Sequence, residues 1–155
     1  GGLEPRELLA AAGGAPLAAL AFADEDRWSR RRALVESYGR VLDGKADPVR
    51  EAERWLQGDL AESLRWLIGW HTDLIRLKMA SEPPRLGNPD LRATLRCWAD
   101  RLPPKALFER LDAAIRLHFL CSTTQANAQQ SLEAFLGDSA ISGEFDVSRT
   151  SVTKG

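Results

Sequence analysis

The longest regular alternation of apolar and polar residues runs from Asp59 to Ala80 and has the period of an α-helix. At 100° per residue its apolar side chains cover an arc of roughly 200°, twice the ~100° stripe that is usual for a helix on a protein surface. We therefore expect this segment to be the central helix of a bundle. The middle of its buried arc is Leu67, and the opposite face carries Glu62, Arg65, Gly69, Thr72, Asp73 and Arg76.

Helical patterns also fill most of the remaining chain, and no stretch alternates convincingly with period two. Acidic or amide caps, prolines in the first turn and glycines after the last turn mark the expected ends. These signals predict helices over 5–12, 16–22, 24–43, 48–57, 89–102, 104–121 and 127–136, besides the central one. The predicted fold class is all-α, a bundle of about seven helices.

The tryptophans separate into two groups. Trp28, Trp55 and Trp98 fall on predicted core stripes, whereas Trp66 and Trp70 lie at the edge of the central helix. Core packing is the first interpretation of that edge pair, and a contact with a partner protein is the second, because tryptophan is enriched at the centres of interfaces. The helix after Pro104 is expected to turn inward Leu107, Phe108, Leu111, Ile115, His118 and Phe119.

Both ends of the chain have their own character. It begins with Gly-Gly and has Met79 as its one methionine, so we interpret it as an excised part of a larger protein. Residues 139–155 are rich in Ser, Thr and Gly, with few large apolar groups to offset their ordering entropy. This segment is predicted to be a flexible tail, and a linker, a tethered peptide and a segment of artificial origin remain open as its identity.

Composition narrows the function classes. The chain has 155 residues, is 44% hydrophobic and 28% charged, and has a formal net charge of −1. These values predict one water-soluble domain and argue against broad electrostatic binding to nucleic acid or anionic membrane. Cys97 and Cys121 are expected to be reduced core residues of a cytosolic protein.

No motif predicts a catalytic centre, a metal site or a cofactor site. The chain has no phosphate-binding loop, no dinucleotide fingerprint and no nucleophile elbow. His71 and His118 are far apart, each on an apolar helical face, and are read as core histidines with hydrogen bonds. The charge runs 24–26 and 30–32 on one helix are read as a solvated face.

Three stretches in register resemble the delta prime subunits of bacterial DNA polymerase III. LEPRELLAAAGGAPLAALAF, at the start, resembles the end of their AAA+ lid domain. RWLIGWHTDLIRLKM and STTQANAQQSLEAFL resemble two helices of the C-terminal collar. The resemblance implies three regions: the end of a lid-like segment over 1–23, a collar domain over 24–138 and a tail over 139–155.

The resemblance implies an oligomerisation role without catalysis. Leu17 stands where motor subunits carry a sensor-two arginine, which fits a subunit that does not turn over ATP. The implied partners are the tau/gamma and delta subunits, with DNA and the sliding clamp reached only through the assembled complex, in the bacterial cytoplasm and without membrane contact. Trp66, Trp70, Arg65 and Arg76 are the candidate interface residues.

Two other classes of function remain open. A stand-alone helical adaptor would bind a partner peptide or helix and needs an exposed apolar groove between helices. A small helical enzyme would use Glu62, Asp73 or His71 as its acid–base group and needs a closed pocket with converging polar side chains.

Overall fold

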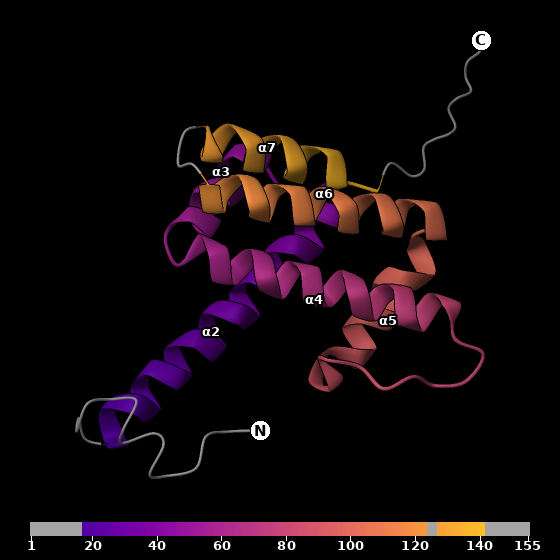
Figure 1. Cartoon of the computed structure of the whole chain (residues 1–155), viewed down its shortest axis with the longest axis horizontal. Coiled ribbons are helices and arrows are strands. Elements are labelled where there is room, and N and C mark those ends of the chain that lie inside the picture. Colours follow the sequence, from indigo (N-terminus) through magenta and orange to yellow (C-terminus); the bar gives the residue numbers. More distant parts are fainter. Residues whose placement is uncertain (1–16, 124–126, 142–155) are drawn as a thin grey trace. The chain divides into compact units, whose positions relative to one another are not determined.

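The computed structural model describes residues 17–123 and 127–141, and the side chains of residues 24–121 and 127–141. All regular structure in these ranges is helical, which confirms the all-α class (Figure 1). The helices are α2 Leu17–Leu42, α3 Pro48–Leu56, α4 Leu60–Met79, the 3-10 helix η1 Pro89–Leu91, α5 Arg92–Arg101, α6 Pro104–Thr123 and α7 Ala128–Ser139.

At both ends of the chain the structure differs from what the sequence predicts. The helices expected over 16–22 and 24–43 are one helix, α2, because no glycine or proline lies between Leu17 and Asp24. The boundary proposed at residue 23 lies inside this helix and stays a prediction. The helix expected over 5–12 and residues 142–155 lie outside the described residues. Ser139, predicted to open the tail, is buried at the end of α7, and the Ile141 N–H donates to the Leu42 carbonyl at 2.8 Å.

The chain forms two compact units that divide within α2, after Val35. In the first unit the described side chains include Trp28, whose predicted place in the core is wrong, since 52% of its surface is exposed. The guanidinium carbon of Arg31 lies 4.8 Å from the centre of the Trp28 ring. This is a cation–π contact between a buried arginine and a half-exposed tryptophan of the same helix.

The second unit is a bundle in which α4 packs along α6 and α5, and α7 packs on α3 and α6 (Figure 1). Tyr38, near the end of α2, lies at the centre of an aromatic cluster. Its ring centroid is 5.5–6.4 Å from those of Trp55, Trp70, His71, Trp98 and Phe135. The predicted core positions of Leu67, Trp55 and Trp98 are confirmed, because all three are buried.

The two aspartates predicted to cap helix starts make capping hydrogen bonds, whereas the two asparagines predicted to do so make none with their side chains. Asp47 accepts a hydrogen bond from the Val49 N–H at 3.0 Å, and Asp59 accepts one from the Glu62 N–H at 3.2 Å, as predicted. Asn127 was expected to cap α7, yet it has a φ of 65° and its side chain makes no capping hydrogen bond. Asn88 likewise leaves η1 uncapped.

A buried polar network joins the end of α2 to α3. The Ser37 hydroxyl donates to Glu51 Oε1 at 2.6 Å and accepts from Trp55 Nε1–H at 2.9 Å. Arg40 and Arg54 form ion pairs with Glu51 at 3.2 and 3.3 Å. Burial alone would raise the pKa of Glu51, but the Ser37 hydrogen bond and the two arginines outweigh it and lower that pKa. The network orients α3 on the core without leaving its carboxylate unpaired.

Candidate functional site

The structure contradicts the predicted interface role of Trp70. Its exposed fraction is 0%, and its ring centroid lies 6.4 Å from each of those of Tyr38, Trp55 and Trp98. A side chain enclosed on all sides cannot touch a partner while the bundle stays folded. Trp70 is therefore a core residue, in agreement with the first interpretation of the edge pair and against the second.

The other three candidate interface residues, Trp66, Arg65 and Arg76, all belong to α4. Trp66 is half-buried and Arg65 is exposed on α4. Arg76 is exposed too and donates to Asp73 Oδ1 at 3.1 Å. Leu17 begins α2, and its side chain lies outside those that the structure describes. The interface roles of Trp66, Arg65 and Arg76 therefore stay predictions.

His71, a candidate acid–base group, is fully buried between two hydrogen-bond partners. Its Nδ1 lies 3.0 Å from the Leu67 carbonyl oxygen, and its Nε2 lies 3.1 Å from the Tyr38 hydroxyl. Since a carbonyl only accepts, Nδ1 carries the proton and Nε2 accepts from Tyr38 in the neutral ring. Burial lowers the pKa of His71 to about 4, the Leu67 hydrogen bond opposes this and the charge of Arg110 adds to it. Burial also raises the pKa of Tyr38 to about 12, so the pair is neutral at pH 7.

This depressed pKa should make stability fall in acid. The unfolded chain takes up the His71 proton as pH drops below about 6.5, whereas the folded chain resists until about pH 4, so stability present above pH 6.5 is lost between these values. The expected loss from this residue is about 3 kcal/mol. Urea unfolding from pH 7 to 4 measures it, with His71→Gln as the control that removes this part of the slope. Equal slopes in the two proteins would contradict the neutral buried histidine.

The carboxylates proposed for an enzyme do not converge with His71. Asp73 is buried but accepts from the backbone N–H groups of Gly87 and Asn88, each at 2.8 Å, and from Asn88 Nδ2 at 2.9 Å. Asp73 therefore anchors the segment before η1 to α4, which corrects its predicted place on the solvent face. Glu62 lies in the first turn of α4. Asp73 and His71 therefore have separate hydrogen-bond partners, and each stabilises a different part of the fold.

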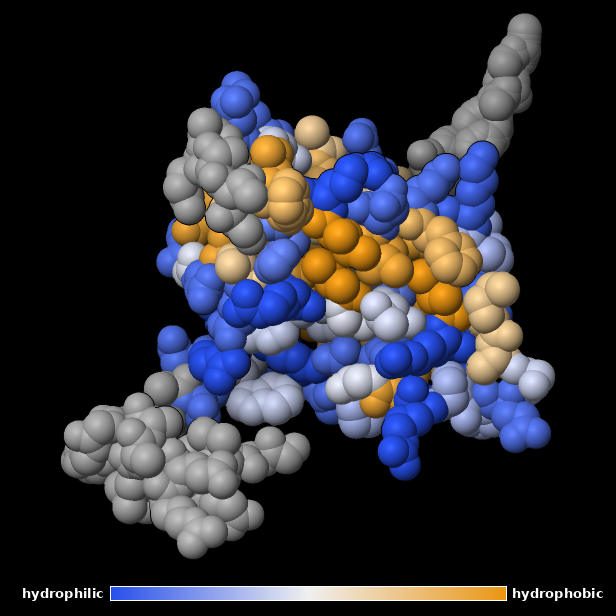
Figure 2. All heavy atoms as spheres, in the orientation of Figure 1, coloured by the Kyte–Doolittle hydropathy of each residue, from blue (hydrophilic) through white to orange (hydrophobic). Residues whose placement is uncertain are grey.

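The outward side of α6 carries an apolar face, and this is the candidate site. Phe108, Ile115, Phe119 and Leu120 are 50%, 47%, 68% and 38% exposed. The prediction that Phe108, Ile115 and Phe119 point inward is therefore wrong. Figure 2 shows apolar side chains gathered in a band over the face where α4 and α6 lie. Soluble monomeric proteins rarely expose a contiguous apolar patch, and such patches commonly mark interaction surfaces.

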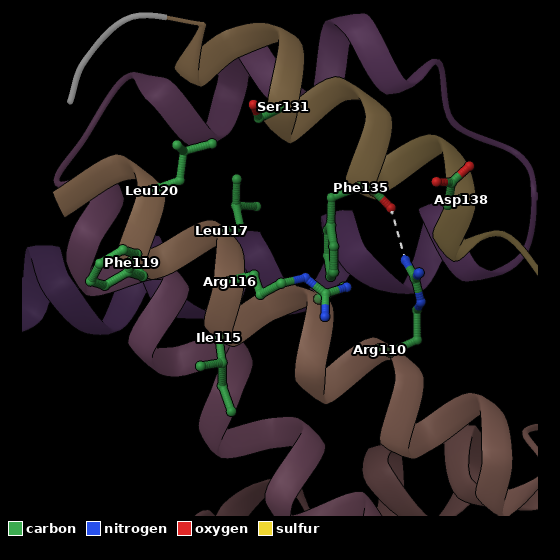
Figure 3. Close-up of a pocket in the computed structure, with 10 residues that line it drawn as sticks. Arg110, Ile115, Arg116, Leu117, Phe119, Leu120, Ser131, Phe135 and Asp138 are labelled. Carbon is green, nitrogen blue, oxygen red and sulfur yellow. Dashed lines mark hydrogen bonds between the residues drawn. The ribbon is translucent and has the colours of Figure 1, made fainter. Parts of the chain in front are cut away.

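Beside this face, α6 and α7 border an open groove with a volume of about 770 Å³ (Figure 3). Leu117, Leu120 and Phe135 are apolar members of its lining, and Arg116 extends across it toward Phe135. Arg110 donates to the Phe135 carbonyl at 3.3 Å and to Ser139 Oγ at 3.2 Å, and its charge lies 5.1 Å from the Phe135 ring centre. Arg116 pairs with Asp112 on the exposed side of α6. The groove is apolar with a charged rim, which suits a helix or peptide better than a small polar substrate.

The described residues were also compared with the requirements of a metal site, a disulfide and a membrane span. No group of three or more His, Cys, Asp or Glu side chains among them could hold a metal ion. Cys97, expected in the core, is exposed, and Cys121 is half-buried; both are free thiols. Among the described helices, none combines the length and apolar character that a membrane crossing requires.

The comparisons with known proteins address the family. No curated protein and no solved structure matches the chain significantly. A family model described as "DNA polymerase III, delta subunit, C terminal" matches residues 25–138, well over half of the chain and all of the bundle's helices from α3 to the last turn of α7. The chain thus belongs to the family formed by the C-terminal domains of DNA polymerase III delta subunits.

Proposed function

We propose that this chain is the collar domain of a bacterial clamp loader and acts by oligomerisation during the loading of sliding clamps. Two observations support this role: membership in the delta C-terminal family and the all-α bundle. Within the assembly, the domain packs against the C-terminal domains of neighbouring subunits. Contact with DNA and with the clamp is made through the complex.

The observation that carries the proposal is the exposed apolar face of α6. A collar is a ring of helical domains, so each member needs outward side chains that pack on a neighbour's helices. Such a face is formed on α6 by Phe108, Ile115, Phe119 and Leu120. These side chains are not part of the core, because the inner side of the same helix is formed by Leu107, Ala114 and Leu117. Truncating an outward residue should therefore weaken assembly more than folding.

Within the clamp loader, we assign the chain to the delta prime subunit, with tau/gamma and delta as its neighbours in the cytoplasm. The support is the sequence resemblance at the two collar helices and at the opening segment, together with Leu17 in place of a sensor arginine. The segment over 1–23 is then the end of the AAA+ lid, and residues 24–138 are the collar. The family description names the delta subunit, so this finer assignment is ours.

A second candidate is the helical adaptor, which the open groove between α6 and α7 favours. An amphipathic helix could lie with its apolar side on Leu117, Leu120 and Phe135. The two functions use neighbouring surfaces of α6 and differ in the partner. The helical enzyme lacks comparable support, since the described groove is open and mainly apolar and His71 is not part of its lining.

The expected result for the collar is that the chain binds the C-terminal domains of tau/gamma and delta from the same organism. Phe119→Ser should weaken this binding by about 2 kcal/mol or more, since a large exposed aromatic side chain at an interface centre contributes on this scale. Calorimetry of the purified components measures it, and thermal unfolding of the variant reports on folding. Arg65→Ala is the matched control, an exposed residue on α4 that tests the alternative face.

The outcomes separate the possibilities. Loss of binding with Phe119→Ser but not with Arg65→Ala places the neighbour on α6. The reverse result moves the interface to the α4 face with Arg65, Trp66 and Arg76. Failure of the parent chain to bind either domain contradicts the collar role, and binding of isolated amphipathic peptides in the groove would then support the adaptor.

A further inference from the structure

The exposed face of α6 is complementary to itself. The helix has 20 residues, and its outward side bears Phe108 near one end, Phe119 and Leu120 near the other, and Ile115 near the middle. Asp112 and Arg116 lie one turn apart beside this apolar stripe, both well exposed. Ala114 lies midway between Asp112 and Arg116 in the sequence. Phe108 and Phe119 are almost equally far from Ala114 along the helix, on opposite sides of it.

We propose that two copies of this chain associate through the outward side of α6, with the two helices antiparallel and a two-fold axis that crosses the helices midway between Asp112 and Arg116. Phe108 of each copy then lies opposite Phe119 and Leu120 of the other. Asp112 of each copy lies opposite Arg116 of the other, so one charge pattern produces two ion pairs. A two-fold interface is the commonest one in homo-oligomers because the same patch serves both partners.

Charge disfavours the parallel arrangement. Parallel helices in register would set Asp112 against Asp112 and Arg116 against Arg116, which places like charges side by side. The antiparallel arrangement replaces both repulsions with attractions and also aligns the helix dipoles favourably. The pattern therefore selects both the occupant, a second copy, and its direction.

The expected dimer is weak. One pair of helices of this length, about 30 Å, covers less than the ~1,600 Å² of a typical stable interface. A dissociation constant of about 10–100 μM is consistent with this size and with the four exposed apolar side chains. The inference stands apart from the proposed function but uses the same face, so neighbouring clamp-loader subunits would displace the second copy.

Sedimentation equilibrium of the whole chain between about 1 and 500 μM tests the proposal over the affinity range expected for a small interface. The parent should show a reversible monomer–dimer equilibrium. Asp112→Arg and Arg116→Asp should each weaken dimerisation at least about tenfold, because each places like charges across the axis. The double variant D112R/R116D should restore the parent's affinity, since it only exchanges the two partners. Met79→Ser, which removes an exposed apolar side chain from α4, is the matched control.

Thermal unfolding of dilute samples keeps the test specific to association. All variants should unfold near the parent's temperature, because an exposed ion pair within one helix contributes little to stability. A parent that stays monomeric overturns the proposal, and so does a double variant that remains as weak as the single ones. Neither result affects the proposed function, which is measured by binding to the other subunits.

Discussion

Trp70→Ala should lower the free energy of unfolding by about 3–5 kcal/mol, as much as or more than Leu67→Ala in the same helix. Both side chains are fully buried in α4. Removing the indole leaves a cavity among Tyr38, Trp55 and Trp98, whose rings the bundle cannot bring together without moving several helices. Since small domains are stable by only about 5–15 kcal/mol, the variant would be partly unfolded at 37 °C. Urea unfolding followed by far-UV circular dichroism measures the change.

Two further substitutions make this test decisive. Trp66→Ala removes the same side chain from a half-buried position and should cost clearly less. Trp70→Phe keeps most of the volume and removes an indole N–H that is buried without an acceptor among the described residues. Its cost should be about 1–2 kcal/mol. If Trp70→Ala is no worse than Trp66→Ala, the burial of Trp70 is contradicted.

Local chemistry explains which parts of the fold the sequence predicts well. Asp47 before Pro48 and Asp59 before α4 mark helix starts because a carboxylate accepts from free first-turn N–H groups. The wide apolar arc of 59–80 required cover from several sides, and α4 indeed packs against both α5 and α6. An acidic residue alone is a weaker sign of a helix start when no glycine or proline precedes it closely. Asp24 was predicted to start a helix, yet α2 continues through it.

The candidate site was not predictable because α6 is apolar on several sides. Leu107, Ala114 and Leu117 face the core, and Phe108, Ile115 and Phe119 face solvent, yet both sets repeat at helical spacing. A helical period locates a stripe but does not say which of two stripes the other helices cover. The excess of apolar residues on α6 was the available signal, because a helix covered on one side needs only one such stripe.

Asp73 gives a second example, in which the missing information is tertiary. Helical spacing places it with the polar residues of α4, and its sequence neighbours give no reason to bury it. Its partners are Gly87 and Asn88, in a segment that returns to α4 only in the folded chain. A carboxylate can be buried only where hydrogen-bond donors surround it. Those donors lie in another segment, so the pattern of α4 alone cannot predict the burial of Asp73.

Asp73→Ala should cost about 3–4 kcal/mol, because it removes the buried acceptor of three hydrogen bonds, which come from the Gly87 N–H, the Asn88 N–H and Asn88 Nδ2. The loss should be local first: the segment between α4 and η1 is held to α4 by this carboxylate. Amide hydrogen exchange at Gly87 and Asn88 should therefore accelerate before global unfolding does. Urea unfolding gives the total free energy, and exchange followed by NMR gives its location.

Matched variants separate the carboxylate's contacts. Asp73→Asn keeps one acceptor oxygen and turns an N–H₂ group toward the remaining donors, so its cost should be roughly half that of alanine. Arg76→Ala removes only the partly exposed ion pair with Asp73 and should cost less than about 1 kcal/mol, with exchange at Gly87 unchanged. If Arg76→Ala proves as costly as Asp73→Ala, the ion pair and not the backbone N–H groups holds this segment. We expect Asp73→Ala to be the costliest of the three variants, Asp73→Asn to be intermediate and Arg76→Ala to be the mildest. The stability that Asp73 contributes then follows the number of hydrogen bonds its carboxylate accepts and not its charge alone.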